Sequence, residues 1–278
     1  MANACSRTCM HLSGNSWNPR APCPSGHGCV SSIQLSPHQT TPITAKRLQE
    51  NKRTEWVFRV DLPISGVSDA VCVVPIDGKG CGVVATRKIR PGERIAAELP
   101  LATLEAHERS QLHIFDTAVR GMDAEKSAQF WRLSQAGRYG SRKTARGVWL
   151  SNAYPRAPLP DGTSQASVYA FASRMNHSCV PNAHVGWSAR LGRNTVHAIS
   201  CIIEGEEVVV SYLDVGLTQE ERRSLSRRKF GFECLCTKCG LIGADKEASD
   251  VRQRRLVQVD AALARADDAH DAEGWAQT

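Results

Sequence analysis

Three cysteines lie close together towards the C-terminal end of the chain, at Cys234, Cys236 and Cys239. A C-x-C-x2-C spacing of this kind is typical of zinc sites, in which four thiolates or imidazoles surround the ion as a tetrahedron. Because this cluster supplies three sulfurs, a fourth ligand must come from another part of the chain. The plain alternative is three reduced thiols that bind nothing.

The fourth ligand is expected among the cysteines of the central region, which are Cys72, Cys81, Cys179 and Cys201. Cys179 lies in an irregular polar stretch, where a side chain can point away from a sheet. The other three lie in apolar or glycine-rich contexts that are typical of buried free thiols. We therefore predict a zinc ion bound by Cys179, Cys234, Cys236 and Cys239, which would fix the C-terminal segment against residues 176–177.

The stretch around Cys179 reads N-H-S-C-V-P-N, from Asn176 to Asn182. Neither a core strand nor an ordinary surface loop uses such a run of polar groups, so we treat it as a candidate binding segment. Taken alone, His177 would more simply be a hydrogen-bonded structural histidine. The G-K-G-C-G stretch at 78–82 adds glycines that let a backbone approach a ligand closely, but it lacks the spacing and the following helix of a dinucleotide fingerprint.

The composition limits the class of protein. The chain has 278 residues, of which 41% are hydrophobic, so a core of ordinary size can form. No run of about 18 apolar residues is present, and we expect no membrane span. The net charge of +7 is spread along the chain. Its densest basic patch, at 222–229, follows two glutamates and indicates a solvated helix face rather than a nucleic-acid groove.

Eleven cysteines is a high and odd number for a chain of this length. Crowded cysteines indicate metal binding in a reducing compartment rather than a disulfide framework. We therefore expect an intracellular protein, in the nucleus, the cytoplasm or both. A monomer is expected.

The chain divides into four parts. Residues 1–54 are expected to be a disordered N-terminal segment, because the first 49 residues contain no Asp or Glu and few large apolar side chains. Its cysteines are spaced too irregularly to favour a metal site. The remaining parts are a strand-rich domain at 55–216 with a helical insert at about 105–148, a zinc segment at 217–240 and a helical tail at 241–278.

Short β-type runs are expected at 56–63, 69–76, 82–86, 94–104, 147–154, 195–203 and 207–213. Asp123 is expected to cap a helix, and Thr218 and Glu221 have the spacing of a capping box. Helical periods predict two apolar stripes, one at Leu112, Phe115 and Val119 and one at Leu256, Val259 and Leu263. The second stripe is expected to dock the tail on the body.

Four stretches follow one another in a fixed order: GKGCG at 78–82, RMNHSCVPN at 174–182, GEEVVVSYLD at 205–214 and FECLCTKC at 232–239. Each is weak alone, but together they resemble the SET domain of protein-lysine methyltransferases, over roughly residues 70–240. The chain is similar to the SET-and-MYND (SMYD) family and to fungal-type SET proteins, which share the helical insert and a GFECLC-like segment. The insert holds no cysteine, so the chain lacks a MYND zinc finger.

The resemblance implies a mainly β member of the α+β class: a SET (β-clip) fold with a pseudoknot, a helical insert and a C-terminal zinc-binding post-SET segment. It also implies S-adenosylmethionine (SAM) as the cofactor, with a lysine channel on the opposite side and a purely structural zinc ion. Tyr212 matches the catalytic tyrosine of the family. The positions that match its SAM-contacting residues are Lys79, Gly80, Cys81, Asn152, Asn176, His177, Tyr212 and Phe232.

The implied reaction is methyl transfer to a lysine amine of a protein, for which a histone tail is one candidate. A free lysine, with a pKa of about 10.4, is almost wholly charged at pH 7, so an apolar channel that lowers this pKa is required. An acidic cluster could attract a basic tail, although surface carboxylates are usually only solvated. Its members are Glu204, Glu206, Glu207 and Asp214.

Two other classes of function are open at this point. A catalytically weak SET module could act as a chromatin or protein-interaction adaptor, but the intact Tyr212, Asn176 and His177 argue against it. A zinc-stabilised nucleic-acid binder would need a strong basic face, which these stretches do not demand. We expect neither direct nucleic-acid binding nor a membrane contact.

Overall fold

The computed structural model describes residues 64–275 apart from 157 and 160, with side chains described as far as residue 265. The segment 1–54, predicted to be disordered, and the β-type run at 56–63 lie outside the described residues. So do the four N-terminal cysteines.

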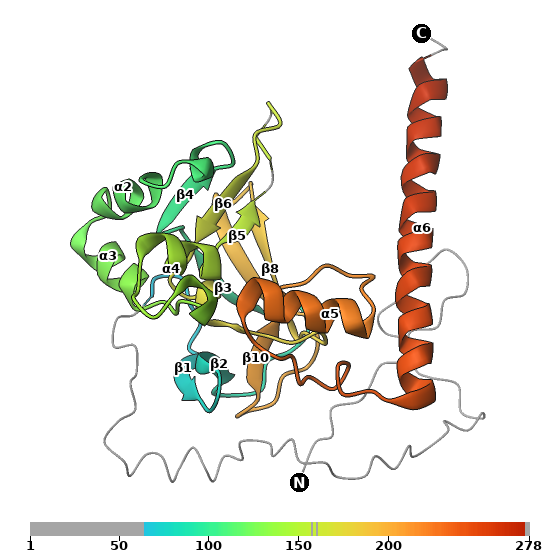
Figure 1. Cartoon of the computed structure of the whole chain (residues 1–278), viewed down its shortest axis with the longest axis horizontal. Helices are drawn as coiled ribbons and strands as arrows, with labels where there is room; N and C mark the ends of the chain where they lie inside the picture. Colours follow the sequence, from blue (N-terminus) through green and yellow to red (C-terminus); the bar gives the residue numbers. More distant parts are fainter. Residues whose placement is uncertain (1–63, 157, 160, 276–278) are drawn as a thin grey trace. The chain divides into compact units, whose positions relative to one another are not determined.

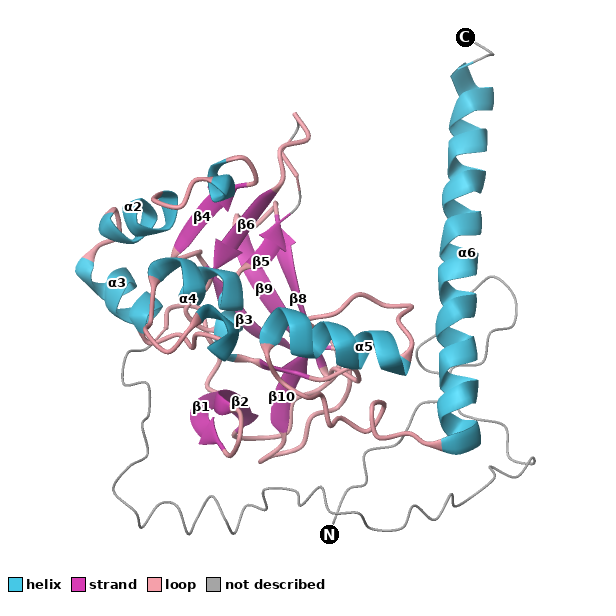
Figure 2. Ribbon diagram, in the orientation of Figure 1, coloured by secondary structure: helices cyan, strands magenta, loops and turns pink. Residues whose placement is uncertain are grey.

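The sheet that carries the polar motifs has four strands in the order β1-β2-β10-β7 (Figures 1 and 2). Their bounds are β1 Val71–Ile76, β2 Gly80–Ala85, β7 Asn176–His177 and β10 Glu207–Val210. β2 pairs antiparallel with β1 and β10, whereas β7 pairs with β10 in parallel. The parallel pair brings the N-H-S-C stretch beside the S-Y-L-D stretch.

Two further antiparallel sheets have three strands each, in the orders β3-β9-β8 and β4-β6-β5. Their bounds are β3 Arg94–Glu98, β4 Ala102–Glu105, β5 Tyr154–Arg156, β6 Gln165–Val168, β8 Ala183–Ser188 and β9 Arg193–Ala198. The run 94–104, predicted as one strand, is thus two strands of different sheets. Pro100 lies between them, and its nitrogen cannot donate a ladder hydrogen bond.

The helical insert consists of η1 Glu108–Ser110, α2 Ile114–Arg120, α3 Ala124–Trp131, η2 Gly137–Tyr139 and α4 Ala145–Asn152. Asp123 caps α3, as predicted, by accepting a hydrogen bond from the backbone N–H of Lys126 at 2.8 Å. Phe115 and Val119 are buried, but Leu112 precedes α2 and is 69% exposed. The first predicted stripe was therefore wrong at Leu112.

The stretch 147–154, predicted to be extended, is helical as far as Asn152. Thr144 caps α4 by accepting a hydrogen bond from the N–H of Gly147 at 3.0 Å. Val148 and Trp149 are fully buried among the apolar side chains of α2 and α3. Burial of this face outweighs the strand preference of both residues, because intrinsic propensity is weaker than tertiary packing.

Two helical segments follow β10. Helix α5 spans Gln219–Leu225 and continues as a π-helical turn at Ser226–Phe230, and α6 spans Gly243–Trp275. Thr218 and Glu221 form the predicted capping box of α5, with hydrogen bonds in both directions.

Helix α6 contacts the body through polar side chains. The N–H of Gln219 donates to Asp250 Oδ1 at 2.8 Å, and the N–H of Gly216 donates to Gln253 Oε1 at 3.3 Å. These bonds decide which face of α6 is covered. The predicted docking stripe was wrong, because its three side chains are exposed. The exposed fractions are 53% at Leu256, 49% at Val259 and 59% at Leu263.

The core has two clusters of buried apolar side chains. One gathers residues of β1, β2, β3, β9 and β10, and the other joins β4 and β6 to the helices of the insert, which lie together in Figure 1. The insert therefore has its own core beside that of the polar motifs.

None of the helices in the described part is long and apolar enough to cross a membrane.

A buried carboxylate positions the start of the N-H-S-C stretch. Glu98, at the end of β3, is 2% exposed. Its oxygens accept hydrogen bonds from the backbone N–H groups of Phe171 at 2.9 Å and Ala172 at 2.7 Å, where η3 (Ala172–Arg174) begins. Burial raises the pKa of Glu98 to about 7, although these hydrogen bonds act in the opposite direction.

We predict that Glu98 stabilises the fold more at pH 5 than at pH 8. A carboxyl whose pKa rises from 4.5 to about 7 on folding binds its proton more tightly in the native state. Its contribution is complete below the unfolded pKa and is lost as the pH rises through about 7, a change of roughly 3 kcal/mol.

Urea unfolding of the wild type and of Glu98→Gln measures this contribution. Between pH 5 and pH 8 the free energy of unfolding of the wild type should fall by roughly 3 kcal/mol more than that of the variant, because the glutamine has no proton to release. The same pH dependence in both proteins would contradict the prediction.

Candidate functional site

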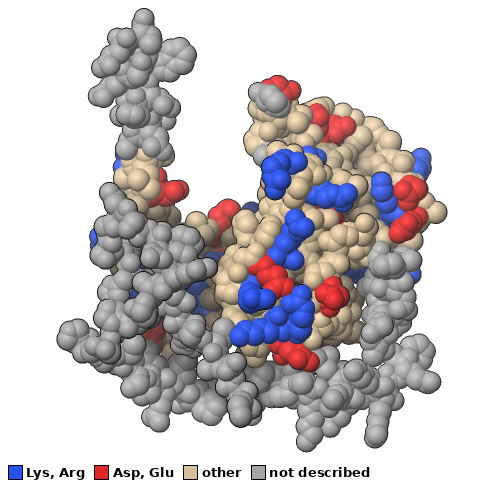
Figure 3. Space-filling view, turned by 180° about the vertical axis from the view of Figure 1, so that it is seen from behind, with Lys and Arg blue, Asp and Glu red and all other residues tan. Residues whose placement is uncertain are grey.

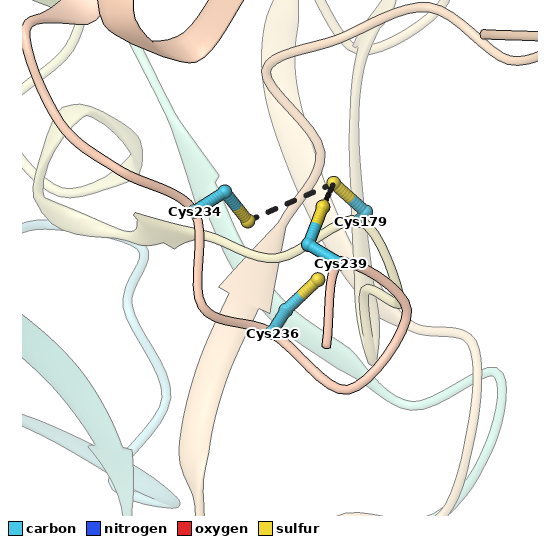
Figure 4. Close-up of side chains that lie close together, drawn as sticks. All are labelled: Cys179, Cys234, Cys236 and Cys239. Carbon is cyan, nitrogen blue, oxygen red and sulfur yellow. Dashed lines mark hydrogen bonds between the residues drawn. The ribbon is translucent and has the colours of Figure 1, made fainter. Parts of the chain in front are cut away.

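The four cysteines predicted to bind zinc lie together, with their sulfurs directed toward one another (Figure 4). Cys179 Sγ is 3.8 Å from Cys234 Sγ and 3.6 Å from Cys239 Sγ, and all four sulfurs lie within 4.8 Å of one another. A tetrahedral zinc ion with Zn–S bonds of about 2.3 Å would set its sulfurs about 3.8 Å apart. The donor set therefore fits such an ion.

Helix α5 holds the cysteine turn in place. Gln219 Nε2 donates to the carbonyl oxygens of Cys239 at 2.9 Å and Leu241 at 2.7 Å. The buried Arg222 donates to the carbonyl oxygen of Lys238 at 3.3 Å. The first turn of α5 thus fixes the cysteine turn at residues 238–241.

His177 connects the cysteine cluster to Tyr212. Its Nδ1 accepts a hydrogen bond from the backbone N–H of Tyr212 at 3.0 Å, and its Nε2 lies 3.2 Å from Cys179 Sγ. Burial lowers the pKa of His177, so the ring is neutral at pH 7. Because Nδ1 is an acceptor, the proton is assigned to Nε2, which faces the sulfur. One imidazole therefore positions both residues.

Tyr212 follows β10 with its ring half-buried. Its hydroxyl donates to the carbonyl oxygen of Met175 at 2.5 Å. Burial, and to a smaller extent the charge of Glu207, raises the pKa of Tyr212 well above its usual range. The group is therefore a neutral phenol at physiological pH. It can orient a neighbour through the lone pairs of its oxygen, and it is not a base.

Two phenylalanines complete an aromatic cluster around Tyr212. The ring centroid of Phe230 is 5.1 Å from that of Tyr212, and the centroids of His177 and Phe232 are 5.8 Å apart. Phe232, predicted to lie near an adenine, packs against His177 just ahead of the cysteine turn. Phe230 was not predicted, although it lies two residues earlier at the end of the π-helical turn.

A cavity of about 380 Å3 opens beside Tyr212. Tyr154, Val185 and Phe230 contribute to its walls, and β8, an edge strand of its sheet, forms one side. Of the predicted acidic cluster, Asp214 lines this cavity. Glu206 and Glu207 instead accept hydrogen bonds from the side chains of Asn182 and Asn176. A mainly apolar cavity of this kind disfavours a charged ammonium.

The G-K-G turn faces the insert across a narrow gap. Gly80 has a φ of +75°, and a Cβ at this position would lie 3.7 Å from Ser134 Oγ. Asn152, predicted to contact a cofactor, donates from Nδ2 to the carbonyl oxygens of Ser134 and Val148, both at 2.6 Å. Asn152 therefore positions the wall opposite Gly80, with both hydrogens of its amide nitrogen engaged.

Asn176 is tied to the same turn. Its Nδ2 donates to the carbonyl oxygen of Cys81 at 3.2 Å and to Glu207 Oε1 at 2.8 Å. Glu207 Oε2 in turn pairs with Lys79 Nζ at 2.7 Å. A Cβ at Gly82 would clash with Asn176 and Glu207, at 2.7 and 2.9 Å. Gly82 is thus needed for this polar packing.

Besides Phe230, three residues at the site were not predicted from the sequence. They are Glu98, Tyr154, whose hydroxyl donates to the carbonyl oxygen of Ala172 at 3.0 Å, and the buried Arg174. Tyr154 could have been found, because it ends the same S-N-A-Y stretch as Asn152. Glu98 and Arg174 carry charges that a strand or a loop normally exposes, so no local pattern distinguishes them.

The sequence of this region matches a known family. Residues 80–213 match the family model described as the SET domain. The histone-lysine N-methyltransferase set5 of Schizosaccharomyces pombe is 32% identical over 194 residues, which cover 69% of this chain and 58% of that protein.

Two further relatives match over shorter stretches. The histone-lysine N-methyltransferase ATXR4 of Arabidopsis thaliana is 37% identical over 83 residues, covering 28% of this chain and 24% of its own length. The N-lysine methyltransferase SMYD2 of Gallus gallus is 34% identical over 88 residues, covering 32% of this chain and 20% of its own length. The chain thus spans little more than half of the first relative and a quarter or less of the other two.

We predict that His177→Phe lowers the free energy of unfolding by about 2 kcal/mol, because the N–H of Tyr212 loses its acceptor in a buried setting. Phenylalanine keeps a ring of similar shape, so the loss reports hydrogen bonding rather than a cavity. Chemical denaturation measures the difference. His113→Phe, at an exposed position, should change stability by less than about 0.5 kcal/mol, and losses of the same size in both variants would refute the prediction.

Proposed function

We propose that this chain, whose residues 80–213 form a SET domain, is a SAM-dependent protein-lysine N-methyltransferase. One observation carries the proposal. The Asn176–His177 pair and the start of β2 meet on one sheet, and Tyr212, which follows its strand β10, borders a mainly apolar cavity. The named activities of the three relatives support the same reaction.

SAM supplies a methyl group carried on a sulfonium. The residues that would hold it are Lys79, Gly80, Cys81, Asn176, His177 and Phe232, with Asn152 fixing the opposite wall. At Gly80 the bare backbone leaves a gap that a side chain would fill. The half-buried ring of Phe232 offers an apolar face to a flat base.

The cavity and Tyr212 prepare the lysine amine. Apolar walls at Val185 and Phe230 disfavour the ammonium form and lower the pKa of the lysine. The oxygen of Tyr212 accepts a hydrogen bond from the amine, while its own hydroxyl still donates to the carbonyl oxygen of Met175. This arrangement orients the lone pair of the nitrogen, and alignment of this kind is a large part of catalysis.

The four-cysteine cluster holds zinc in a structural role. The four cysteines would fill all four tetrahedral positions, which would leave no open position for a reacting group. Through His177 the ion would also restrain Tyr212. The proposed partner is a lysine-bearing protein, with a histone tail as one candidate, and the proposed setting is the nucleus or the cytoplasm.

Two observations weigh against the competing functions. A SET module that only binds partners has no need of a tyrosine that lines a cavity and whose hydroxyl is held by a backbone carbonyl, as that of Tyr212 is. For nucleic-acid binding, three of the five cations in the densest basic stretch are already engaged. Arg222 is buried, and both Arg223 and Arg227 lie 3.4 Å from Glu233. Figure 3 shows basic and acidic side chains interspersed on one face of the molecule.

We predict that Tyr212→Phe reduces methyl transfer by about 100-fold or more while SAM affinity stays within about threefold, because the hydroxyl aligns the amine and does not build the fold. Transfer of radiolabel from SAM to histones and to a cell extract measures the first effect, and calorimetry the second. Tyr139→Phe, in the insert, should transfer label at the wild-type rate. Full activity of Tyr212→Phe, or a wild type that binds no SAM, would refute the proposal.

We predict about one zinc ion per purified chain. Cys236→Ser should lose most of it, since one ligand of four is removed and structural zinc binding is also folding energy. Cys81→Ser, outside the cluster, should keep it. Elemental analysis after dialysis decides, and equal zinc in both variants would exclude the cluster as the binding site.

A further inference from the structure

Two edge strands of different sheets form walls of the cavity beside Tyr212. Tyr154 of β5 and Val185 of β8 both line it. β5 pairs with β6, whereas β8 pairs with β9. Within the part of the chain that the structure describes, no hydrogen bond or ion pair joins residues 154–156 to residues 183–188. The strand ladders therefore do not fix the separation of these two walls.

A cation–π contact joins the two walls. The guanidinium carbon of Arg156 lies over the ring of Trp187, 3.6 Å from its centroid, and β5 and β8 lie next to each other in Figure 2. Side chains two residues apart on a strand share a face. Arg156 thus follows Tyr154 on one wall, and Trp187 follows Val185 on the other. The contact lies just beyond the lining of the cavity and spans its two walls.

The Trp187 ring is the close partner of the Arg156 guanidinium. Arg156 forms no salt bridge with any described residue. Its buried Nε has no hydrogen-bond partner among them, and its Nη1 lies 3.4 Å from Thr103 Oγ1. Both Arg156 and Trp187 are half-buried, and partial loss of water strengthens the attraction of a guanidinium to an aromatic face. The charge of Arg156 is therefore directed to the ring and not to a carboxylate.

We propose that the contact between Arg156 and Trp187 sets the spacing of the two walls and so positions the substrate lysine, an inference that rests on the proposed function. Neither residue is part of the cavity lining, so both are positioning residues. Small misplacement of reacting groups is costly in rate. Loss of the contact should weaken use of the peptide substrate and spare SAM, because the residues that would hold SAM lie on other elements.

The test follows methyl transfer from radiolabelled SAM to a pool of peptides with one central lysine and random flanking residues. Arg156→Gln should lower the apparent kcat/KM about tenfold, mainly through KM, as expected for loss of one half-buried cation–π contact. Its affinity for SAM, measured by calorimetry, should stay within about threefold of the wild type. Arg156→Lys should recover most of the loss, because an ammonium also binds an aromatic face. Arg190→Gln, in the exposed β8–β9 turn, should match the wild type.

A double-mutant cycle shows whether the two residues act through each other. Trp187→Leu should cause a loss of similar size, and the variant with both substitutions should lose no more than either alone. Additive losses, or wild-type kinetics of Arg156→Gln, would overturn the inference and leave the methyltransferase proposal standing. If the wild type labels neither these peptides nor histones nor the extract, the proposed function fails, and this inference with it. If Trp187→Leu does not fold, Arg156→Gln and Arg156→Lys decide.

Discussion

The site depends on the two hydrogen-bonding positions of one buried imidazole. His177 accepts the backbone N–H of Tyr212 at Nδ1 and faces Cys179 Sγ with Nε2. The parallel pairing of β7 with β10 sets the first contact, and the second is made by Cys179, two residues further along, whose sulfur lies beside those of Cys234 and Cys239. The segment that carries Tyr212 could not move away from β7 without leaving Nδ1 of His177 unpaired in a buried setting, which is costly. The strand that leads to Tyr212 and the cysteine cluster therefore form one unit.

Polar and apolar groups divide this unit into two environments. Around the G-K-G turn, Asn176, Glu207 and Lys79 satisfy one another through short hydrogen bonds and an ion pair. Beside Tyr212, the cavity is lined largely by aromatic and aliphatic side chains. A charged, polar cofactor suits the first environment, and a neutral amine suits the second. Tyr212 borders the cavity, and its backbone is fixed by His177.

The sequence predicted the parts of this arrangement that depend on local chemistry. The capping box at Thr218 follows from spacing along the chain, and so does the cap at Asp123. The choice of Cys179 as the fourth member of the cluster rested on the polarity of its own stretch, and the four sulfurs do lie together. What failed depended on tertiary packing. Burial of Trp149 made a helix of a stretch with strand preference, and the polar contact at Asp250 turned the stripe of α6 toward solvent.

The hydrogen bonds also exclude Tyr212, His177 and Glu207 as the base of the proposed reaction. Tyr212 keeps its proton, because burial raises its pKa and the carbonyl oxygen of Met175 accepts its hydrogen bond. His177 has its lone pair occupied by the N–H of Tyr212, and Glu207 is shared between Lys79 and Asn176. In the proposed reaction the proton of the lysine would therefore pass to water or to Asp214, which lines the cavity. The chain would contribute a cavity that favours the neutral amine and an oxygen that aligns it.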